Sequence, residues 1–155
     1  MRSAYLTAGV VAIAMLTAGF ASAAEKKISR ADLPAEVEKT VQEQSAGATI
    51  VGFTKEVEDG QLEYEAAMTV NGHSKSVSIA TDGSLLETEE DVDQSTLPAS
   101  VLQALTARAK GAKIATVESV TKQGKIVSYE STTVKGNKKS EIAVGPNGET
   151  LAHED

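Results

Sequence analysis

Two glutamates, Glu63 and Glu65, are the residues of this chain whose type and spacing come closest to acid–base chemistry. They stand two positions apart in the alternating stretch LEYEAAMTV, so both side chains are expected on one face of a β-strand. Paired carboxylates perform acid–base work when burial separates their pKa values. Ser76 and Ser78 alternate in the same way in the next stretch, KSVSIAT, which indicates a polar neighbourhood. We therefore interpret this surface as a solvated sheet face.

The two histidines do not add a catalytic group. His73 falls in an expected hairpin turn, His153 lies near the C-terminal end, and no serine or cysteine motif accompanies either one. The chain contains no cysteine, and it lacks the Gly-x-Ser-x-Gly, His-Glu-x-x-His and P-loop patterns. We predict that the protein is not an enzyme and that it holds no cofactor or metal.

The densest acidic run, ETEEDVDQS, covers residues 87–95 and partly matches the start of a calcium-binding loop from Asp91 onwards. The match fails at the sixth position, Thr96, where such a loop needs glycine, and at the twelfth, Leu102, where it needs glutamate. We interpret the run as a solvated linker whose charge favours the N-terminus of a following helix.

These residues are carried by a unit that is written twice. Asp32 to Ile50 (DLPAEVEKTVQEQSAGATI) and Thr96 to Ile114 (TLPASVLQALTARAKGAKI) share Leu-Pro-Ala, apolar residues at helical spacing and Gly-Ala-x-Ile. Proline near the start and glycine at the end are typical of helix boundaries. Alternating runs separated by Asp-Gly or Asn-Gly pairs then predict antiparallel hairpins.

The fold class that follows is α+β, with two tandem units that each combine a helix with a four-stranded antiparallel meander (αββββ twice). We expect the helices to pack on one face of the sheet and the other face to meet water. The units span residues 32–91 and 92–155. Their two sheets either lie side by side or join into one.

Residues 1–23 predict a secretory signal peptide. Met1 and Arg2 precede an uncharged apolar run that ends in Ala21-Ser22-Ala23, the small-x-small pattern that signal peptidase cleaves. An uncleaved anchor helix is the alternative, but the charged residues from Glu25 onwards favour cleavage after Ala23. We expect a periplasmic or secreted protein in which residues 24–31 form a flexible leader.

The charge of the chain limits its partners. The net charge is −7 and the sequence contains no basic cluster. Nucleic acids and anionic lipid surfaces are bound through lysine and arginine, so we predict neither nucleic-acid binding nor membrane binding after signal cleavage.

The ordered series Leu-Pro-Ala, helix, Gly-Ala-x-Ile, Gly turn, Tyr-Glu, Val-x-Gly and Asp-Gly or Asn-Gly resembles the PepSY-like family, also described as β-lactamase-inhibitor-like. The resemblance covers residues 32–91 and 96–155. It implies an exported tandem of helix-plus-sheet units and an open sheet face of the kind that related inhibitors use to clasp an enzyme. It implies no catalytic residues.

We therefore predict an exported, non-enzymatic binding protein that inhibits or chaperones another exported protein through its open sheet face. The alternative is a small-ligand or cation-binding module that uses the acidic strand ends and residues 87–93. Without tryptophan, and with Arg30 and Arg108 as the only mature arginines, the chain has few of the anchors that tight interfaces use, so the face suits weak binding or a cationic partner. The candidate partner-binding residues are Glu63, Glu65, Ser76, Ser78 and Glu141.

Overall fold

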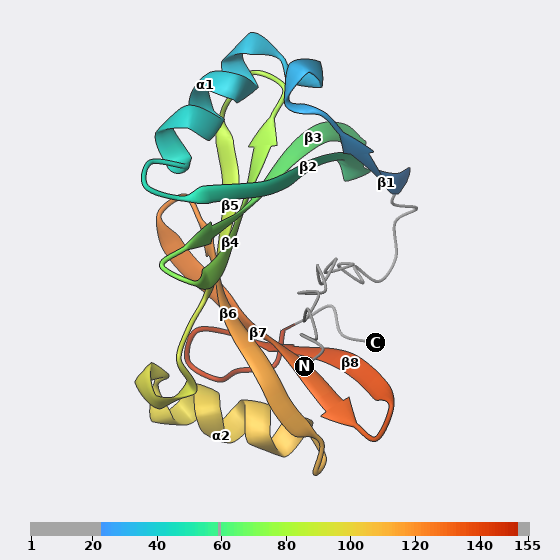
Figure 1. Ribbon diagram of the computed structural model, residues 1–155. Coiled ribbons are helices and arrows are strands. Elements are labelled where there is room, and N and C mark those ends of the chain that lie inside the picture. Colours follow the sequence, from blue (N-terminus) through green and yellow to red (C-terminus); the bar gives the residue numbers. More distant parts are fainter. Residues whose placement is uncertain (1–22, 59, 152–155) are drawn as a thin grey trace, which may run out of the picture.

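The computed structural model describes residues 23–58 and 60–151, and Figure 1 shows one antiparallel sheet with two helices. The sheet contains β1 (Ala23–Ile28), β2 (Thr49–Glu58), β3 (Gln61–Val70), β4 (His73–Ala80), β5 (Leu85–Asp91), β6 (Lys113–Lys122), β7 (Lys125–Lys135) and β8 (Lys138–Val144). The helices are α1 (Ala35–Gln44) and α2 (Ala99–Arg108), each preceded by a short 3-10 turn, η1 (Arg30–Asp32) and η2 (Gln94–Thr96).

The expected signal peptide lies outside the described residues apart from Ala23, so its cleavage stays a prediction. Within the described part of the chain, neither helix is long and apolar enough to span a membrane.

Each helix begins after the expected proline, and the expected glycine follows its end. Each starts after a proline whose carbonyl accepts the first helical hydrogen bond, from Glu38 N to Pro34 O at 2.9 Å and from Leu102 N to Pro98 O at 3.0 Å. Downstream of the helices, Gly47 and Gly111 adopt φ values of 77° and 79°, which suit glycine and turn the chain back toward the sheet.

All eight strands belong to a single meander, in which each strand pairs with its neighbours in sequence. The junction between the halves is the pairing of β5 with β6, from Glu87 opposite Lys122 to Asp91 opposite Glu118. Residues 87–91 of the acidic run that we interpreted as a linker therefore belong to a central strand, and the two expected sheets are one continuous surface. An unpaired edge of β5 would leave a row of backbone amides and carbonyls without partners, which the pairing with β6 avoids.

The prediction of two αββββ units is therefore wrong, although the protein is α+β. One strand, β1, precedes α1, and within the described residues α2 is followed by three strands, β6, β7 and β8.

The expected flexible leader is also corrected, because most of it forms β1. This strand pairs with β2, with Lys27 opposite Thr54 and Ile28 opposite Phe53. Ile28 packs against the first hydrophobic core, and the strand covers the outer edge of β2. Apolar contact and backbone pairing together order this segment.

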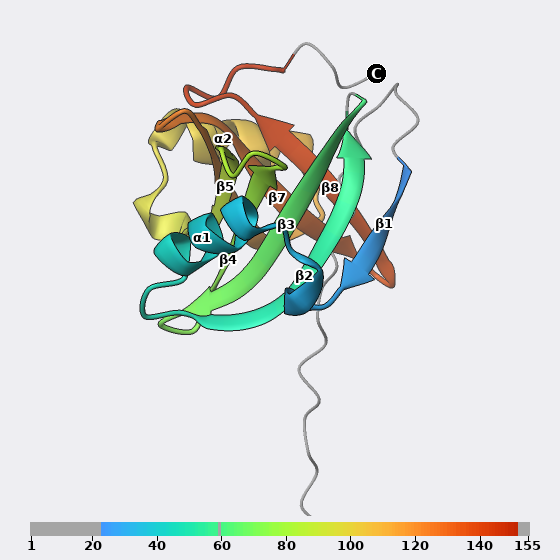
Figure 2. The ribbon, with the colours of Figure 1, turned by 90° about the horizontal axis from the view of Figure 1, so that it is seen from above.

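The helices lie near opposite ends of the curved sheet, on its outer side, as Figures 1 and 2 show. The sheet curves so that its edge strands β1 and β8 lie on the side away from the helices. Under α1, Val37 and Val41 meet a core that includes Tyr64 and Met68. Under α2, Val101 and Leu105 meet Tyr129 and others. We call the opposite, inner surface of the sheet the helix-free face.

Two glycines allow the helices to approach the sheet closely. A Cβ atom at Gly83 would lie 2.8 Å from the carbonyl oxygen of Glu36 in α1, and one at Gly148 would lie 2.6 Å from that of Ser100 in α2. Thr40 Oγ1 donates a hydrogen bond to Gly83 O at 2.6 Å, which fixes the first of these contacts.

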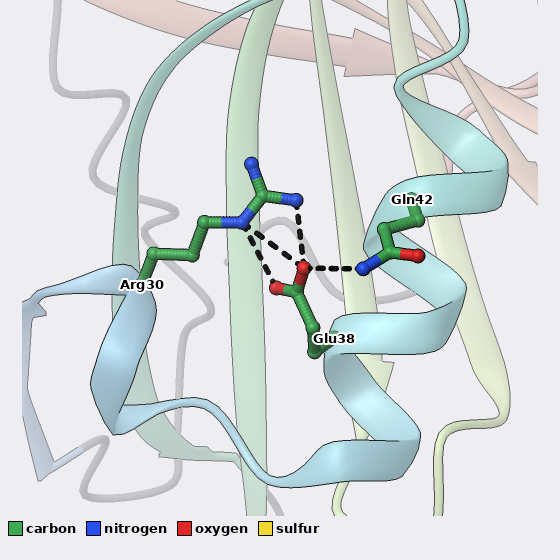
Figure 3. Close-up of polar contacts among 3 residues, drawn as sticks. All are labelled: Arg30, Glu38 and Gln42. Atoms are coloured by element: carbon green, nitrogen blue, oxygen red, sulfur yellow. Dashed lines mark hydrogen bonds and ion pairs between the residues drawn. The ribbon is translucent and has the colours of Figure 1, made fainter.

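A polar cluster on the surface joins η1 to α1, as Figure 3 shows. Arg30 donates from Nε and Nη2 to the Glu38 carboxylate, with the shortest contact at 2.7 Å, and Gln42 Nε2 donates to Glu38 Oε1 at 2.8 Å. These hydrogen bonds, led by that of Arg30, hold the pKa of Glu38 below its ordinary value. The cluster lies on the helix side of the molecule and fixes η1 against α1.

Candidate functional site

Strand register brings four of the five candidate residues together on the helix-free face. Glu65 of β3 stands opposite Ser78 of β4, and Ser76 stands opposite Ala67. Glu63 follows the same alternation as Glu65 along β3 and therefore points to the same side. The core residues between them, such as Tyr64, point toward α1.

The same alternation continues across the junction into β5 and β6. Ser76 and Ser78 stand opposite Glu89 and Glu87, and Glu87 stands opposite Lys122. Glu87 and Glu89, which we had assigned only to the alternative cation-binding module, thus lie at its centre.

The outer strands complete the face. Glu118 of β6 stands opposite Glu130 of β7, and Thr132 of β7 stands opposite Glu141 of β8. Glu141, the fifth candidate residue, is exposed and lies on the edge strand. The acidic face consists of the glutamates at Glu63, Glu65, Glu87, Glu89, Glu118, Glu130 and Glu141.

The central glutamates are buried, which reasoning from sequence missed. Glu87 is 8% exposed and Glu89 is 7% exposed. Charged side chains are almost never fully buried unless they are paired, so we had assigned residues 87–95 to solvent. The signal that was available is the spacing of Glu87, Glu89 and Asp91, which follows the two-residue period of a strand.

Hydrogen bonds from neighbouring strands hold the carboxylates in place. Ser76 Oγ donates to Glu89 Oε2 at 3.0 Å, and Thr54 Oγ1 donates to Glu65 Oε2 at 3.2 Å. These serine and threonine side chains fix the orientation of the carboxylates but bring no positive charge.

Lys122 is the cation at the centre of the face. Its Nζ lies 2.7 Å from Glu87 Oε2, and its side chain is 54% exposed while that of Glu87 is 9% exposed. Burial opposes the charge of Lys122, but the hydrogen bond to Glu87 and the surrounding glutamates leave its pKa raised. The buried carboxylate of Glu87 therefore holds the partly exposed Lys122 as a cation.

The remaining carboxyl groups resist ionisation. Burial and the adjacent Glu87 raise the pKa of Glu89 to about 8. Burial, followed by the charges of neighbouring acidic groups, raises the pKa of both Glu63 and Glu118 to about 7. Burial also raises the pKa of Glu65 and Glu130, and that of the edge residue Glu141. Near neutral pH the face is therefore partly protonated, and it gains charge when a cation approaches.

A hollow of about 240 Å³ opens on this face between β1 and β6. Its volume is below the roughly 300–1,000 Å³ of sites that enclose a drug-sized molecule. It is large enough for a side chain of a partner. The polar side chains that line it include Lys27, Thr54, Glu65, Ser76, Glu89 and Glu118.

The acidic residues are not arranged as a metal site. Within residues 23–58 and 60–151, no three histidine, aspartate or glutamate side chains are grouped so that they could hold an ion. In the stretch that partly matched a calcium loop, Asp93 Oδ1 accepts from Ser95 N at 2.8 Å and Asp91 Oδ2 accepts from Ser74 N at 3.1 Å. These carboxylates fix local backbone, one of them at the start of η2.

No family model matches the chain, and no curated protein matches it in sequence. Solved structures do match. A protein of Bacteroides eggerthii that is described as periplasmic is 21% identical, with a TM-score of 0.62 over 79% of this chain and 88% of that one. A BLIP-like protein of Bacteroides fragilis is 19% identical, with a TM-score of 0.57 over 79% and 86%. A DUF2874 family protein of Bacteroides ovatus is 22% identical, with a TM-score of 0.59 over 77% and 84%.

These similarities define the class of fold. The chain has the fold of the BLIP-like and DUF2874 proteins, in agreement with the inhibitor-like part of the resemblance seen in the sequence. At these identities the similarity concerns the fold alone.

Proposed function

We propose that this protein is an exported, non-enzymatic binding protein of the PepSY-like type, which inhibits or chaperones another exported protein held against its helix-free face. The observation that carries the proposal is the continuous inner surface of eight strands, which neither helix covers. The proposal includes a signal peptide over residues 1–23 and PepSY-like units over residues 32–91 and 92–155.

The chemistry of the face supports a binding role. Glu87 and Glu89 are buried at its centre beside Val120, and buried carboxyl groups are a costly arrangement for a surface that serves stability alone. Groups with strongly shifted pKa values cluster at functional sites more often than elsewhere. The fold is also that of a BLIP-like protein, whose name refers to an inhibitor.

A small cationic ligand is the second candidate. It is favoured by the four glutamates around the hollow, Glu25, Glu65, Glu89 and Glu118. The hollow occupies only part of the acidic face, which extends as far as Glu141 on β8, so a ligand of this size would leave most of the face unused.

Site-directed photocrosslinking in the producing cells tests the proposal. A photoreactive amino acid replaces Ser78 at the centre of the helix-free face or Glu141 at its edge, and the control replaces Gln103 on the exposed side of α2. We expect adducts with exported proteins from the first two positions and none from the third. Adducts that form equally at Gln103, or none at either face position, would refute a clasp.

A further inference from the structure

We propose that the occupant of the helix-free face is an extended polypeptide segment rich in lysine and arginine, which crosses the strands from β3 to β7. This inference rests on the function proposed above and specifies its partner. It goes beyond the fold similarity, which does not define the chemistry of any partner.

The face already contains an example of the interaction. The ammonium group of Lys122 binds the buried carboxylate of Glu87 at 2.7 Å, while much of the lysine side chain stays exposed. Charge-assisted hydrogen bonds of this length are stronger than neutral ones. A lysine that arrives from a partner can therefore bind a neighbouring glutamate in the same way that Lys122 binds Glu87.

The neighbouring glutamates have no such partner among residues 23–58 and 60–151. Among the described residues, no lysine or arginine forms an ion pair with Glu65, Glu89 or Glu118. All three line the hollow of about 240 Å³ together with Glu25 and Lys27, so a side chain that enters from outside meets four carboxyl groups and one ammonium group.

The electrostatic cost of burying these carboxyl groups favours a positively charged partner. A neutral or acidic segment would bury these carboxyl groups further without compensating them, and their pKa values would rise above those already raised by burial. A basic segment supplies the missing charge and lowers the same pKa values. Complementary charge across an interface favours the basic partner and penalises the others.

The extent of the face favours a chain over a single cation. Between β3 and β7 the glutamates of the acidic face lie on β3, β5, β6 and β7, and β4 contributes Ser76 and Ser78. With neighbouring strands about 4.8 Å apart, this path measures roughly 19 Å. One side chain cannot reach across it, but alternate lysine or arginine residues of an extended segment can.

Fluorescence anisotropy with defined peptides tests the inference. The probes are a labelled peptide of alternating lysine and serine, a matched peptide of alternating glutamate and serine, and free spermine as a competitor, all used with the exported protein at pH 8. The test variant is Glu89→Gln with Glu118→Gln. The control, Glu36→Gln with Glu43→Gln, replaces the same number of carboxyl groups at exposed positions of α1.

We expect the lysine peptide alone to bind, the face variant to bind it at least tenfold more weakly, and the control variant to stay within twofold of the parent. Equal loss in both variants would overturn the inference, because it would assign binding to net charge. Competition by spermine at the peptide's own affinity would overturn it in favour of a small polycation.

The two proposals fail in different ways. If crosslinking at Ser78 captures an exported protein and the Glu89/Glu118 variant captures it equally well, the clasp stands and the basic partner is excluded. If the face positions capture nothing, the proposed function falls.

Discussion

The two halves of the molecule place a helix on the sheet in the same way but fill the space between them differently. In the first half (α1 with β2 to β5), Ala66 and Met68 of β3 point toward the helix beside Tyr64. In the second half (α2 with β6 to β8), Ser131 and Thr133 follow Tyr129 in β7 at the same spacing and are also buried. The second core therefore contains two hydroxyl groups where the first has apolar side chains.

This difference shows that the arrangement of helix on sheet does not depend on a fully apolar core. A buried hydroxyl costs free energy unless it is hydrogen-bonded. Thr133 Oγ1 meets this condition by donating to Ser140 O at 3.0 Å, but Ser131 Oγ is buried without a hydrogen-bond partner. We expect the second half to contribute less to stability and to depend more on the β5–β6 junction.

The largest expected effect tests the difference between the cores directly. Met68→Ala removes a fully buried side chain and should lower the free energy of unfolding by about 2–5 kcal/mol. Thr133→Ala removes one methyl group and one hydrogen bond and should cost about 1 kcal/mol. Urea denaturation measures both values. Equal losses would mean that the second core is packed as tightly as the first.

The two glycines test what the halves share. Gly83→Ala and Gly148→Ala each place a Cβ atom against a helix carbonyl at a φ of 86°, so both should cost on the order of 2–3 kcal/mol. Gly136→Ala is the control, because φ is also positive there but nothing lies within 4 Å of the added atom. Its expected cost is about 1 kcal/mol. A loss at Gly83 without one at Gly148 would contradict the equivalence of the two helix contacts.

Stability against pH tests whether both halves share the acidic face. The folded-state pKa of Glu89 is about 8 against an ordinary 4.5, so the folded state binds more protons between these values. Unfolding free energy should therefore fall as pH rises from about 5 to 8.5, by on the order of 1–3 kcal/mol.

Glu89→Gln from the first half and Glu118→Gln from the second should each flatten this dependence in thermal denaturation. The control is Glu90→Gln, which changes an exposed residue on the other side of β5. A slope that only Glu89→Gln alters would confine the effect to the first half.

The smallest expected effect is a gain. Ser131→Ala removes the hydroxyl group without a partner and gives β7 the residue that β3 has as Ala66. The variant should be more stable by about 1 kcal/mol, measured by the urea midpoint. A loss of stability would mean that the Ser131 hydroxyl makes a favourable contact in solution.

Local chemistry was sufficient to predict the helices and part of the site. Pro34 and Gly47 mark the region of α1, and alternation along β3 and β4 places Glu63, Glu65, Ser76 and Ser78 on one face. These features depend on residues close in sequence, whose steric and hydrogen-bonding preferences act without the rest of the fold.

The junction and the edge strand were not predictable in this way. Acidic residues make up four of the seven positions of β5 and favour solvent when taken alone, and only pairing with β4 and β6 makes the strand central. β1 likewise depends on the free edge of β2, together with the contact of Ile28 with the first core. Both strands result from pairing across the sheet, which composition does not encode; the two-residue spacing of Glu87, Glu89 and Asp91 indicates a strand but not its central place.

The strand order of the sheet also has a consequence for how the protein is made. Every strand pairs with the strand before it, from β1 to β8, so no strand waits for a distant segment of the chain. Folds dominated by contacts between sequence neighbours form quickly because little loop-closure entropy opposes them. A chain that emerges N-terminus first from a ribosome or a translocation pore can therefore add one hairpin after another, whereas α2 completes its packing only after β8 and Gly148 have appeared.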